Sequence, residues 1–321
     1  ASAAGCNLVA ASGGDDRAAG TAAHPLRTPQ AVVDRLRAGQ TGCLRGGVYG
    51  ERGDQGYIAR FGHGGRPGRP LTLRSYPGER ATLAGVVYVT HDAPDVTLAD
   101  LVIDDPTAYD QYQELAVEIN ATRTTLVRDE ITTHQDKTCV ILGAGDAGRA
   151  VHTVIRDSVL RDCGSPSRGL LDHAIYAAHA TGLRVVGNVI SGTAGYGVHL
   201  YPDAQRSVVR GNVMSGNGGG VIFAGEGDSA SSRNRVERNV IVGSTQRPDI
   251  SGWWSGRTGR NNVARRNCLS RAIEDHTGFR ISANRVGEVR FADGFRIADA
   301  GACAPIVARS TASVATAMAA R

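Results

Sequence analysis

The chain has 321 residues, 41% of them hydrophobic and 5% aromatic, with 36 basic residues against 31 acidic ones and a formal net charge of +5. This apolar content excludes a disordered chain, and no run approaches the length of about 18 apolar residues that predicts a membrane-spanning helix. The basic residues are 35 Arg and a single Lys, Lys137. They are scattered without an aromatic-basic cluster, so we expect an anionic partner other than nucleic acid.

Residues 1–50 predict an N-terminal strand followed by a helix. Thr28-Pro29 supplies a cap residue and a proline at the first helical position. The next segment, QAVVDRLRAG (30–39), has apolar residues at helical spacing and ends on a glycine, which is a stop signal. We expect this helix to cap the N-terminal end of a repetitive fold, because stacked repeats leave open ends.

Residues 51–269 contain a repeat. LRVVGNVISGTAGYGVHLYP (183–202) resembles SVVRGNVMSGNGGGVIFAG (207–225), and Asn188 and Asn212 within them are 24 residues apart. The same slot is followed through seven segments at steps of 24 to 31 residues. Its occupants are Asp100, Asp129, Asp157, Asn188, Asn212, Asn239 and Asn267.

This period predicts an all-β solenoid of about 8–10 coils, because it is too short for βαβ units with their helices. Each coil is expected to contain two or three short strands joined by turns, and to bury its apolar face only by stacking on its neighbours. The repeated Asn and Asp side chains then stack in a turn and bond the backbone of the next coil. We predict one domain over 1–321, in which residues 270–321 form the last coils and the C-terminal cap.

Six cysteines predict three disulfides between sequence neighbours, Cys6–Cys43, Cys139–Cys163 and Cys268–Cys303. The middle pair is 24 residues apart, close to one coil, so its Cα atoms can reach disulfide distance. Three disulfides favour an extracellular location. The chain begins ASAAGC, as a mature protein does after removal of a signal peptide, so we expect a secreted protein. We also expect it to be a monomer.

Residues 19–51 resemble the entry segment of secreted right-handed parallel β-helix proteins, with a proline-containing turn, a helix, a GQT turn and a G-x-Y-x-E strand. Together with the coils of 86–267, this segment makes most of the chain similar to the pectin-lyase-like superfamily. LLDHAIY (170–176) is similar to the W-I-D-H stretch of pectate lyases at Asp172 and His173, without its Trp. The resemblance implies a right-handed parallel β-helix with substrate lying along one sheet. It leaves the activity open, because the fold hosts lyases, hydrolases, epimerases, esterases and adhesins.

The strand before each repeated slot predicts a patch of outward side chains. Alternation along these strands sends Tyr176, His199 and Tyr201 outward and the apolar residues between them inward. Glu118 falls in the same column two coils earlier. We expect the patch to lie within two or three coils of the solenoid.

At the leading edge of the same strands, Lys137 aligns with His173. His, Tyr and Lys side chains in one patch suit proton transfer, because burial and neighbouring charge bring their pKa values toward neutrality. We therefore predict an extracellular lyase that cleaves a uronic-acid polysaccharide by β-elimination. The expected base is His199, with Lys137 or His173 as the alternative, and the expected acid is Tyr201 or Tyr176.

Other residues are expected to hold the substrate or a metal ion. The substrate-binding candidates are Arg206, Arg168, Glu118, Trp253 and Trp254. Arginine suits a uronate carboxylate because its planar fork makes two bonds to it, and the aromatic rings, with Tyr109 and Tyr112 of the insert 104–116, can stack on sugars. No cofactor is firmly predicted, but Ca²⁺ takes oxygen ligands from turns, and the candidate ligands are Asp203, Glu226 and Asp228.

Three alternatives stay open. A glycoside hydrolase needs two carboxylates about 5–10 Å apart, for which Glu118 with Glu226 or Asp203 is the visible pair. A C5-epimerase would share the site of the lyase. A non-catalytic carbohydrate-binding solenoid predicts a regular, repetitive outward face, which this chain lacks.

Overall fold

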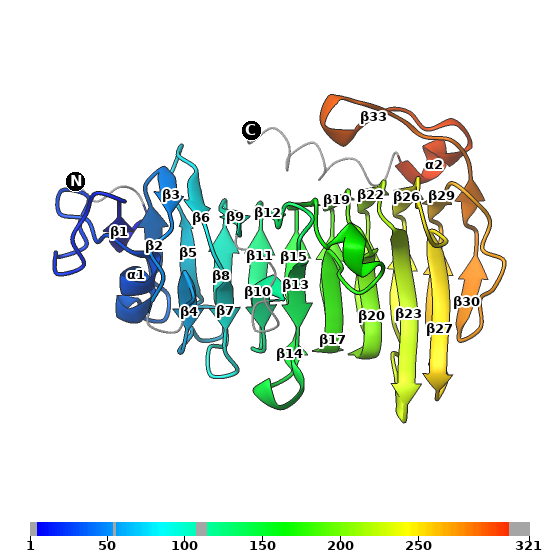
Figure 1. The fold of residues 1–321 in the computed structure, drawn as a ribbon, viewed down its shortest axis with the longest axis horizontal. Coiled ribbons are helices and arrows are strands. Elements are labelled where there is room, and N and C mark those ends of the chain that lie inside the picture. Colours follow the sequence, from blue (N-terminus) through cyan, green and yellow to red (C-terminus); the bar gives the residue numbers. More distant parts are fainter. Residues whose placement is uncertain (1–4, 54–55, 107–113, 308–321) are drawn as a thin grey trace.

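The computed structural model describes residues 5–53, 56–106 and 114–307, in which short strands stack along one long axis (Figure 1). Tyr109, Tyr112 and the tail from 308 lie outside the described residues. Successive coils add strands to three sheets, here called A, B and C, in which the stacked strands pair in parallel. The all-β solenoid predicted from the repeat is therefore confirmed, and its strands pair in parallel as the family resemblance implies.

The sheets are listed by their strands in the order in which they stack. Sheet A contains β1 (Leu8–Ala10), β2 (Thr41–Leu44), β5 (Leu71–Ser75), β8 (Val96–Ala99), β11 (Thr125–Val127), β15 (Val154–Arg156), β18 (Arg184–Val186), β21 (Val208–Arg210), β25 (Arg235–Glu237), β28 (Asn262–Arg265) and β30 (Phe279–Ser282). Sheet B contains β3 (Gly47–Tyr49), β6 (Ala81–Leu83), β9 (Val102–Asp104), β12 (Glu130–Thr132), β16 (Val159–Arg161), β19 (Val189–Ser191), β22 (Val213–Ser215), β26 (Val240–Val242), β29 (Cys268–Leu269) and β31 (Arg285–Val286). Sheet C contains β4 (Ala59–Phe61), β7 (Val87–Val89), β10 (Leu115–Ile119), β13 (Thr138–Leu142), β17 (Ile175–Thr181), β20 (Tyr196–Gln205), β23 (Gly219–Gly227) and β27 (Ile250–Gly256), with β14 (Ala150–Val151) and β24 (Ser229–Ala230) at its margins.

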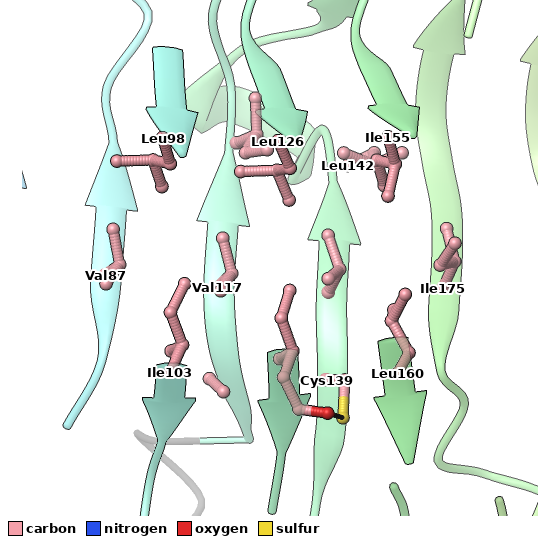
Figure 2. Packing of buried hydrophobic residues seen from close by; sticks show 14 of the residues in the cluster. Val87, Leu98, Ile103, Val117, Leu126, Cys139, Leu142, Ile155, Leu160 and Ile175 are labelled. Carbon is pink, nitrogen blue, oxygen red and sulfur yellow. Dashed lines mark hydrogen bonds between the residues drawn. The ribbon is translucent and has the colours of Figure 1, made fainter. Parts of the chain in front are cut away.

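The core is made of aliphatic rows that run along the solenoid axis (Figure 2). In sheet A, Leu98, Leu126 and Ile155 stack in register and are 0% exposed. Rows such as Val87, Val117 and Ile175 face them from sheet C. Burying each such side chain stabilises the fold by about 1.5–3 kcal/mol, and this burial is available only once coils stack.

The Asn ladder is present, with a one-residue correction in its first half. Asn188, Asn212, Asn239 and Asn267 are 0% exposed, and each backbone N–H donates to the side-chain oxygen of the next coil at 2.9–3.0 Å. The preceding coils use Asp129 and Ser158.

Asp100 and Asp157, which the sequence placed in the ladder, lie one residue before it. Their φ angles are 60° and 54°, so they occupy the left-handed turn position that Gly187 and Gly211 fill in later coils. Both neighbouring positions favour Asp or Asn, because these residues tolerate left-handed backbone and also bond it. Residue type alone therefore could not separate the two positions.

Both ends of the solenoid carry additional elements. Near the N-terminus, α1 (Pro29–Arg35) is capped by Thr28, whose hydroxyl accepts from the Ala31 backbone N–H at 3.1 Å. This helix packs beside β1, β2 and β4 and buries Val32 and Val33 (Figure 1). It ends at Arg35, earlier than the glycine signal predicted, because Leu36 is already extended.

At the other end, β32 (Arg290–Ala292) and β33 (Arg296–Asp299) form a hairpin, followed by α2 (Ala304–Val307). The short helical turns η1 (Gly145–Ala147), η2 (Pro166–Arg168), η3 (Asp293–Phe295) and η4 (Gly301–Cys303) complete the described elements. All three predicted disulfides are confirmed, and they join Cys6 to Cys43, Cys139 to Cys163 and Cys268 to Cys303. Within the described residues, no helix is long and apolar enough to cross a membrane.

Candidate functional site

Sheet C carries the longest strands of the molecule, and these form the floor of the candidate site. β17, β20, β23 and β27 have 7, 10, 9 and 7 residues, while the earlier strands of the sheet have 3 to 5 (Figure 1). Tyr176 pairs with His199, and His199 pairs with Ile222 on the next coil. Val198 and Leu200 are 0% exposed, whereas Tyr176, His199 and Tyr201 reach the surface, so the predicted alternation is confirmed.

A groove with a volume of about 750 Å³ lies over this floor. Tyr196, His199 and Tyr201 line it from β20. Its walls come from the loop before β17 and from the turns before β27 and after β29. The wall residues include Leu170, Leu171, Arg247, Trp253, Arg271, Glu274 and Asp275.

A hydrogen-bonded pair of histidines lies beneath the groove. His173 is 2% exposed, and its Nε2 lies 2.7 Å from Nδ1 of His199. The other nitrogen of His173, Nδ1, accepts a hydrogen bond from the backbone N–H of Tyr196 at 3.2 Å. Burial lowers the pKa of His173 well below its usual value, and His199 lowers it further. Burial also lowers the pKa of His199 to about 3.

This network assigns the protons on both rings. A neutral imidazole has one donor and one acceptor nitrogen. Because Nδ1 of His173 accepts from Tyr196, its proton is on Nε2 and is donated to His199. Nδ1 of His199 is then an acceptor, so the proton of His199 is on Nε2. His199 therefore presents an N–H donor to the groove. A nitrogen that carries a proton cannot accept one, so this tautomer does not fit the base role that the sequence predicted for His199.

The histidine pair predicts a loss of stability in acid. Both pKa values lie below 6.5 in the folded protein, so the unfolded chain binds protons first as the pH falls. Their contribution is complete above pH 6.5 and is lost below it, at about 1.4 kcal/mol per pH unit for each histidine. Denaturant unfolding at pH 7.5 and 5.0 should show a smaller loss in the His173→Asn/His199→Asn double variant than in the wild type.

The comparison with the wild type isolates the histidines, because other titrating groups are common to both proteins. Asp129 is one of these, and burial raises its pKa to about 7, which acts in the opposite direction. An equal loss of stability in the variant and the wild type would contradict the proton assignment.

Tyr201 forms the second acid–base pair of the site. Its hydroxyl donates to Oε2 of Glu226 on the neighbouring strand β23. Burial and the Glu226 carboxylate raise the pKa of Tyr201 to about 12. Tyr176 stacks over His199 with ring centroids 5.3 Å apart, and its pKa is also raised to about 12, mainly by burial. All of these rings are therefore neutral near pH 7, and both phenols carry their protons.

Trp253 and two arginines complete the walls of the groove. Trp253 is 49% exposed, and its ring centroid lies 5.9 Å from that of Tyr201. An exposed indole ring of this kind can stack on a sugar. Arg247 and Arg271 also line the groove. These arginines and Tyr196 were not predicted from the sequence, because they lie outside the aligned column of outward residues. One feature of the sequence could have indicated Tyr196. It occupies the position that Gly219 holds in the next coil, so a large aromatic residue replaces a glycine there.

Lys137 does not belong to the site, contrary to the sequence prediction. It is 0% exposed and pairs with Asp105, also 0% exposed, with Nζ and Oδ2 2.6 Å apart. Thr138, rather than Lys137, lies beside His173, since its Oγ1 accepts from the His173 backbone N–H at 3.1 Å. The predicted alignment of Lys137 with His173 was therefore wrong by one residue. Lys137 precedes the strand, where the inward–outward alternation of side chains no longer fixes the alignment.

Trp254 is also not in the groove. Its Nε1 donates to the Thr277 carbonyl at 2.8 Å, and its ring packs against Gly278 and the core. Adjacent residues of a strand point to opposite faces, so Trp253 and Trp254 cannot both face the substrate.

The remaining candidates for substrate binding lie around the groove rather than in it. Arg206 follows β20 at the corner between sheets C and A and does not line the groove. Arg168 lies near Asp172, with Nε and Oδ2 3.5 Å apart, in the loop whose Leu170 forms the groove wall. Glu118 lies in the predicted column two coils before Tyr176. It is half-buried and accepts from Asn120, and burial raises its pKa.

The predicted calcium ligands do not come together. Asp203 pairs with Arg149, whereas Glu226 binds Tyr201. Asp228 lies in the turn between β23 and β24. Within the described ranges, no three His, Cys, Asp or Glu side chains gather in a group that could hold a metal ion.

The fold is a right-handed parallel β-helix. A family model described as "right handed beta helix region" matches residues 140–294. A comparison with curated protein sequences finds no matching relative.

Solved structures of carbohydrate-related proteins share this fold. Pectate lyase Pel9A is similar with a TM-score of 0.64 at 16% identity, over 87% of this chain and 76% of that chain. A glycoside hydrolase gives 0.62 at 9% identity, over 87% and 88%. The tailspike protein of an E. coli bacteriophage, solved with a pentasaccharide, gives 0.56 at 13% identity, over 86% and 50%. At these identities the likeness establishes the fold alone.

Proposed function

We propose that the protein is a secreted, carbohydrate-active enzyme that cleaves an acidic polysaccharide by β-elimination in the groove over sheet C. The observation that carries this proposal is the set of neutral, hydrogen-bonded acid–base groups beneath a groove with arginine walls. Elimination next to a uronate carboxylate needs donors for that carboxylate, a base and an acid. Two arginines, the His199 donor and the Tyr201–Glu226 pair supply these types of group. The three disulfides support an extracellular location.

Binding of the uronate carboxylate is assigned to Arg247, Arg271 and Nε2–H of His199. Hydrogen bonds to the carboxylate stabilise the negative charge that develops as the neighbouring carbon loses its proton. His173 keeps His199 in the tautomer that donates, so it is a positioning residue. Trp253 stacks on a sugar ring beside the cleaved bond.

Proton transfer is assigned to Tyr201 and Tyr176. As the C–H bond next to the carboxylate breaks, its proton goes to the phenolic oxygen of Tyr201, and the phenolic proton of Tyr201 passes to Glu226. The bond to the leaving oxygen then breaks and a carbon–carbon double bond forms. Tyr176, which its raised pKa keeps protonated, donates a proton to the leaving oxygen.

A panel of acidic polysaccharides tests this function. Polygalacturonate, alginate and a glycosaminoglycan are each incubated with the purified protein, while ultraviolet absorbance and reducing ends are followed together. The expected result is that both rise on one substrate, because each elimination forms an unsaturated uronide and a new reducing end. Reducing ends without absorbance would indicate hydrolysis, with Glu274 and Asp275 of the groove wall as the first carboxylates to substitute. Neither signal on any substrate would contradict the lyase proposal.

A further inference from the structure

Sheet A carries a row of arginines on its C-terminal half, on a different side of the solenoid from the groove. Six consecutive strands of this sheet, β15 to β30, each place one arginine outward. The residues are Arg156, Arg184, Arg210, Arg235, Arg265 and Arg280, here called the arginine surface. The residues that alternate with them, such as Val185 and Val236, are 0% exposed and point into the core.

The strand register arranges these arginines in two neighbouring columns. Arg184, Arg235 and Arg280 share one column, in which Val208 and Val263 lie between them. The other three lie two residues further along their strands, in a column that also contains Val186 and Glu237. The guanidinium groups are thereby staggered rather than directly opposed, which reduces the repulsion between like charges on adjacent strands.

Turns at both edges of the sheet add further positive charge. Arg206 and Arg233 precede β21 and β25, and Arg266 follows β28; all three are exposed. Their φ angles are 54° to 61°, in the left-handed region where Gly or Asn is the usual occupant. Arg206, a predicted ligand of the substrate carboxylate, thus belongs to this side of the molecule.

The two halves of sheet A differ in how their arginines are neutralised. In the N-terminal half, Arg123 pairs with Asp95, and both Arg74 and Arg128 pair with Asp100. In the C-terminal half, Glu237 is the only acid on the sheet A strands β18, β21, β25, β28 and β30, and it pairs with Arg265 at 2.7 Å and with Arg210 at 4.0 Å. Arg156 on β15 pairs with Asp157. Among residues 5–53, 56–106 and 114–307, no ion pair is found for Arg184, Arg235 or Arg280. The C-terminal half of sheet A therefore has an excess of positive charge, carried by these three arginines.

The shape and chemistry of this surface fit a linear polyanion. Neighbouring strands lie about 4.8 Å apart, so six strands span about 24 Å. Arginine forks bind carboxylates and sulfates with paired hydrogen bonds. Single-stranded nucleic acids are bound by aromatic side chains on which the bases stack. The outward positions of the sheet A strands β18, β21, β25, β28 and β30 carry Arg, Val, Ser and Glu without an aromatic residue.

We propose that the arginine surface binds an anionic polysaccharide and so holds the protein on a polyanionic matrix, independently of catalysis in the groove. Sheets A and C are separate faces, so the two sites can be occupied at the same time. This proposal does not depend on the proposed lyase activity, because it rests only on the charge of the arginine surface and on the strand register that arranges it.

The test uses heparin, a sulfated polysaccharide, and polygalacturonate, a carboxylated one, as immobilised probes over a series of salt concentrations. The variant is Arg184→Ala/Arg210→Ala/Arg235→Ala. Its matched control is Arg17→Ala/Arg37→Ala/Arg66→Ala, which removes the same charge from exposed positions elsewhere. The expected result is about 10-fold weaker binding by the sheet A variant at 0.1 M salt, with the log–log salt slope reduced by about two. The control should bind within about twofold of the wild type.

Each other outcome would overturn the proposal. Unchanged binding by the sheet A variant would show that the arginine surface is not the site. Equal weakening of the control would show that net charge, rather than this surface, determines binding. Tighter binding to duplex DNA than to either polysaccharide would assign another class of partner. Binding to the probes is measured separately from cleavage, so failure of the lyase assay leaves this test intact.

Discussion

Replacing Tyr201 with Phe is expected to lower kcat about 1,000-fold, within the range for loss of a proton-transfer group. The substitution removes one oxygen atom. The ring remains to stack against His199, at a centroid distance of 5.1 Å, and against Trp253. KM should therefore change little, and the thermal unfolding midpoint should stay within a few degrees of the wild type. Initial rates on the substrate found in the polysaccharide panel provide the measurement.

Glu226→Gln should be impaired to a similar degree, because Tyr201 and Glu226 act as one proton path. The double variant should be no slower than either single variant, which is the signature of residues that act as a unit. The matched control is Tyr88→Phe, which makes the same chemical change on the same face of sheet C, in a coil remote from Tyr201. If Tyr201→Phe kept more than about a tenth of the wild-type kcat, Tyr201 would not be the group that takes the proton.

Replacing Asn212 with Ala is expected to lower the free energy of unfolding by about 3–5 kcal/mol. Asn212 is 0% exposed, and its side-chain oxygen accepts from both the backbone N–H and the side-chain amide of Asn188, at 2.9 and 3.0 Å. Its amide donates to the Val185 carbonyl and to Asn239, each at 2.9 Å. Alanine leaves these groups buried without partners and opens a small cavity. Urea unfolding at neutral pH measures the effect.

Asn284 supplies the control, because it is the last member of the same ladder. Its side chain makes the same types of bond, to Asn267 and to the Ala264 carbonyl, but it is only partly buried. Water can replace these bonds, so Asn284→Ala should cost about 1 kcal/mol. Equal effects of the two substitutions would contradict the view that burial makes the ladder stabilising.

The fold could be predicted from the sequence because repetition and alternation are local patterns. The spacing between Asn188 and Asn212 set the length of a coil, and the period of two along β20 set the outward direction of His199 and Tyr201. The pairing of Cys139 with Cys163 followed from the same coil length. These inferences needed no knowledge of which side chains meet in space.

The sequence was a weaker guide at strand edges and corners. Lys137 was assigned to the surface because the alternation that orients strand residues does not extend to the residue before β13. Asp157 was placed in the ladder because Asp suits both the left-handed turn and the following slot. Arg206 was a candidate for the substrate carboxylate because an arginine fork suits a carboxylate, but the chain turns from sheet C onto sheet A at this residue.

The sequence alone determined a solenoid with coils of 24 to 31 residues and an outward face that carries Tyr176, His199 and Tyr201. Both follow from periodicities that extend over a few residues to one coil. The tertiary structure alone decided which polar groups meet: His173 with His199, Tyr201 with Glu226, and Lys137 with Asp105. It also gathered the dispersed arginines into columns on sheet A. The physical reason is that these contacts join different coils, so they depend on strand register and side-chain direction, which exist only once the coils have stacked.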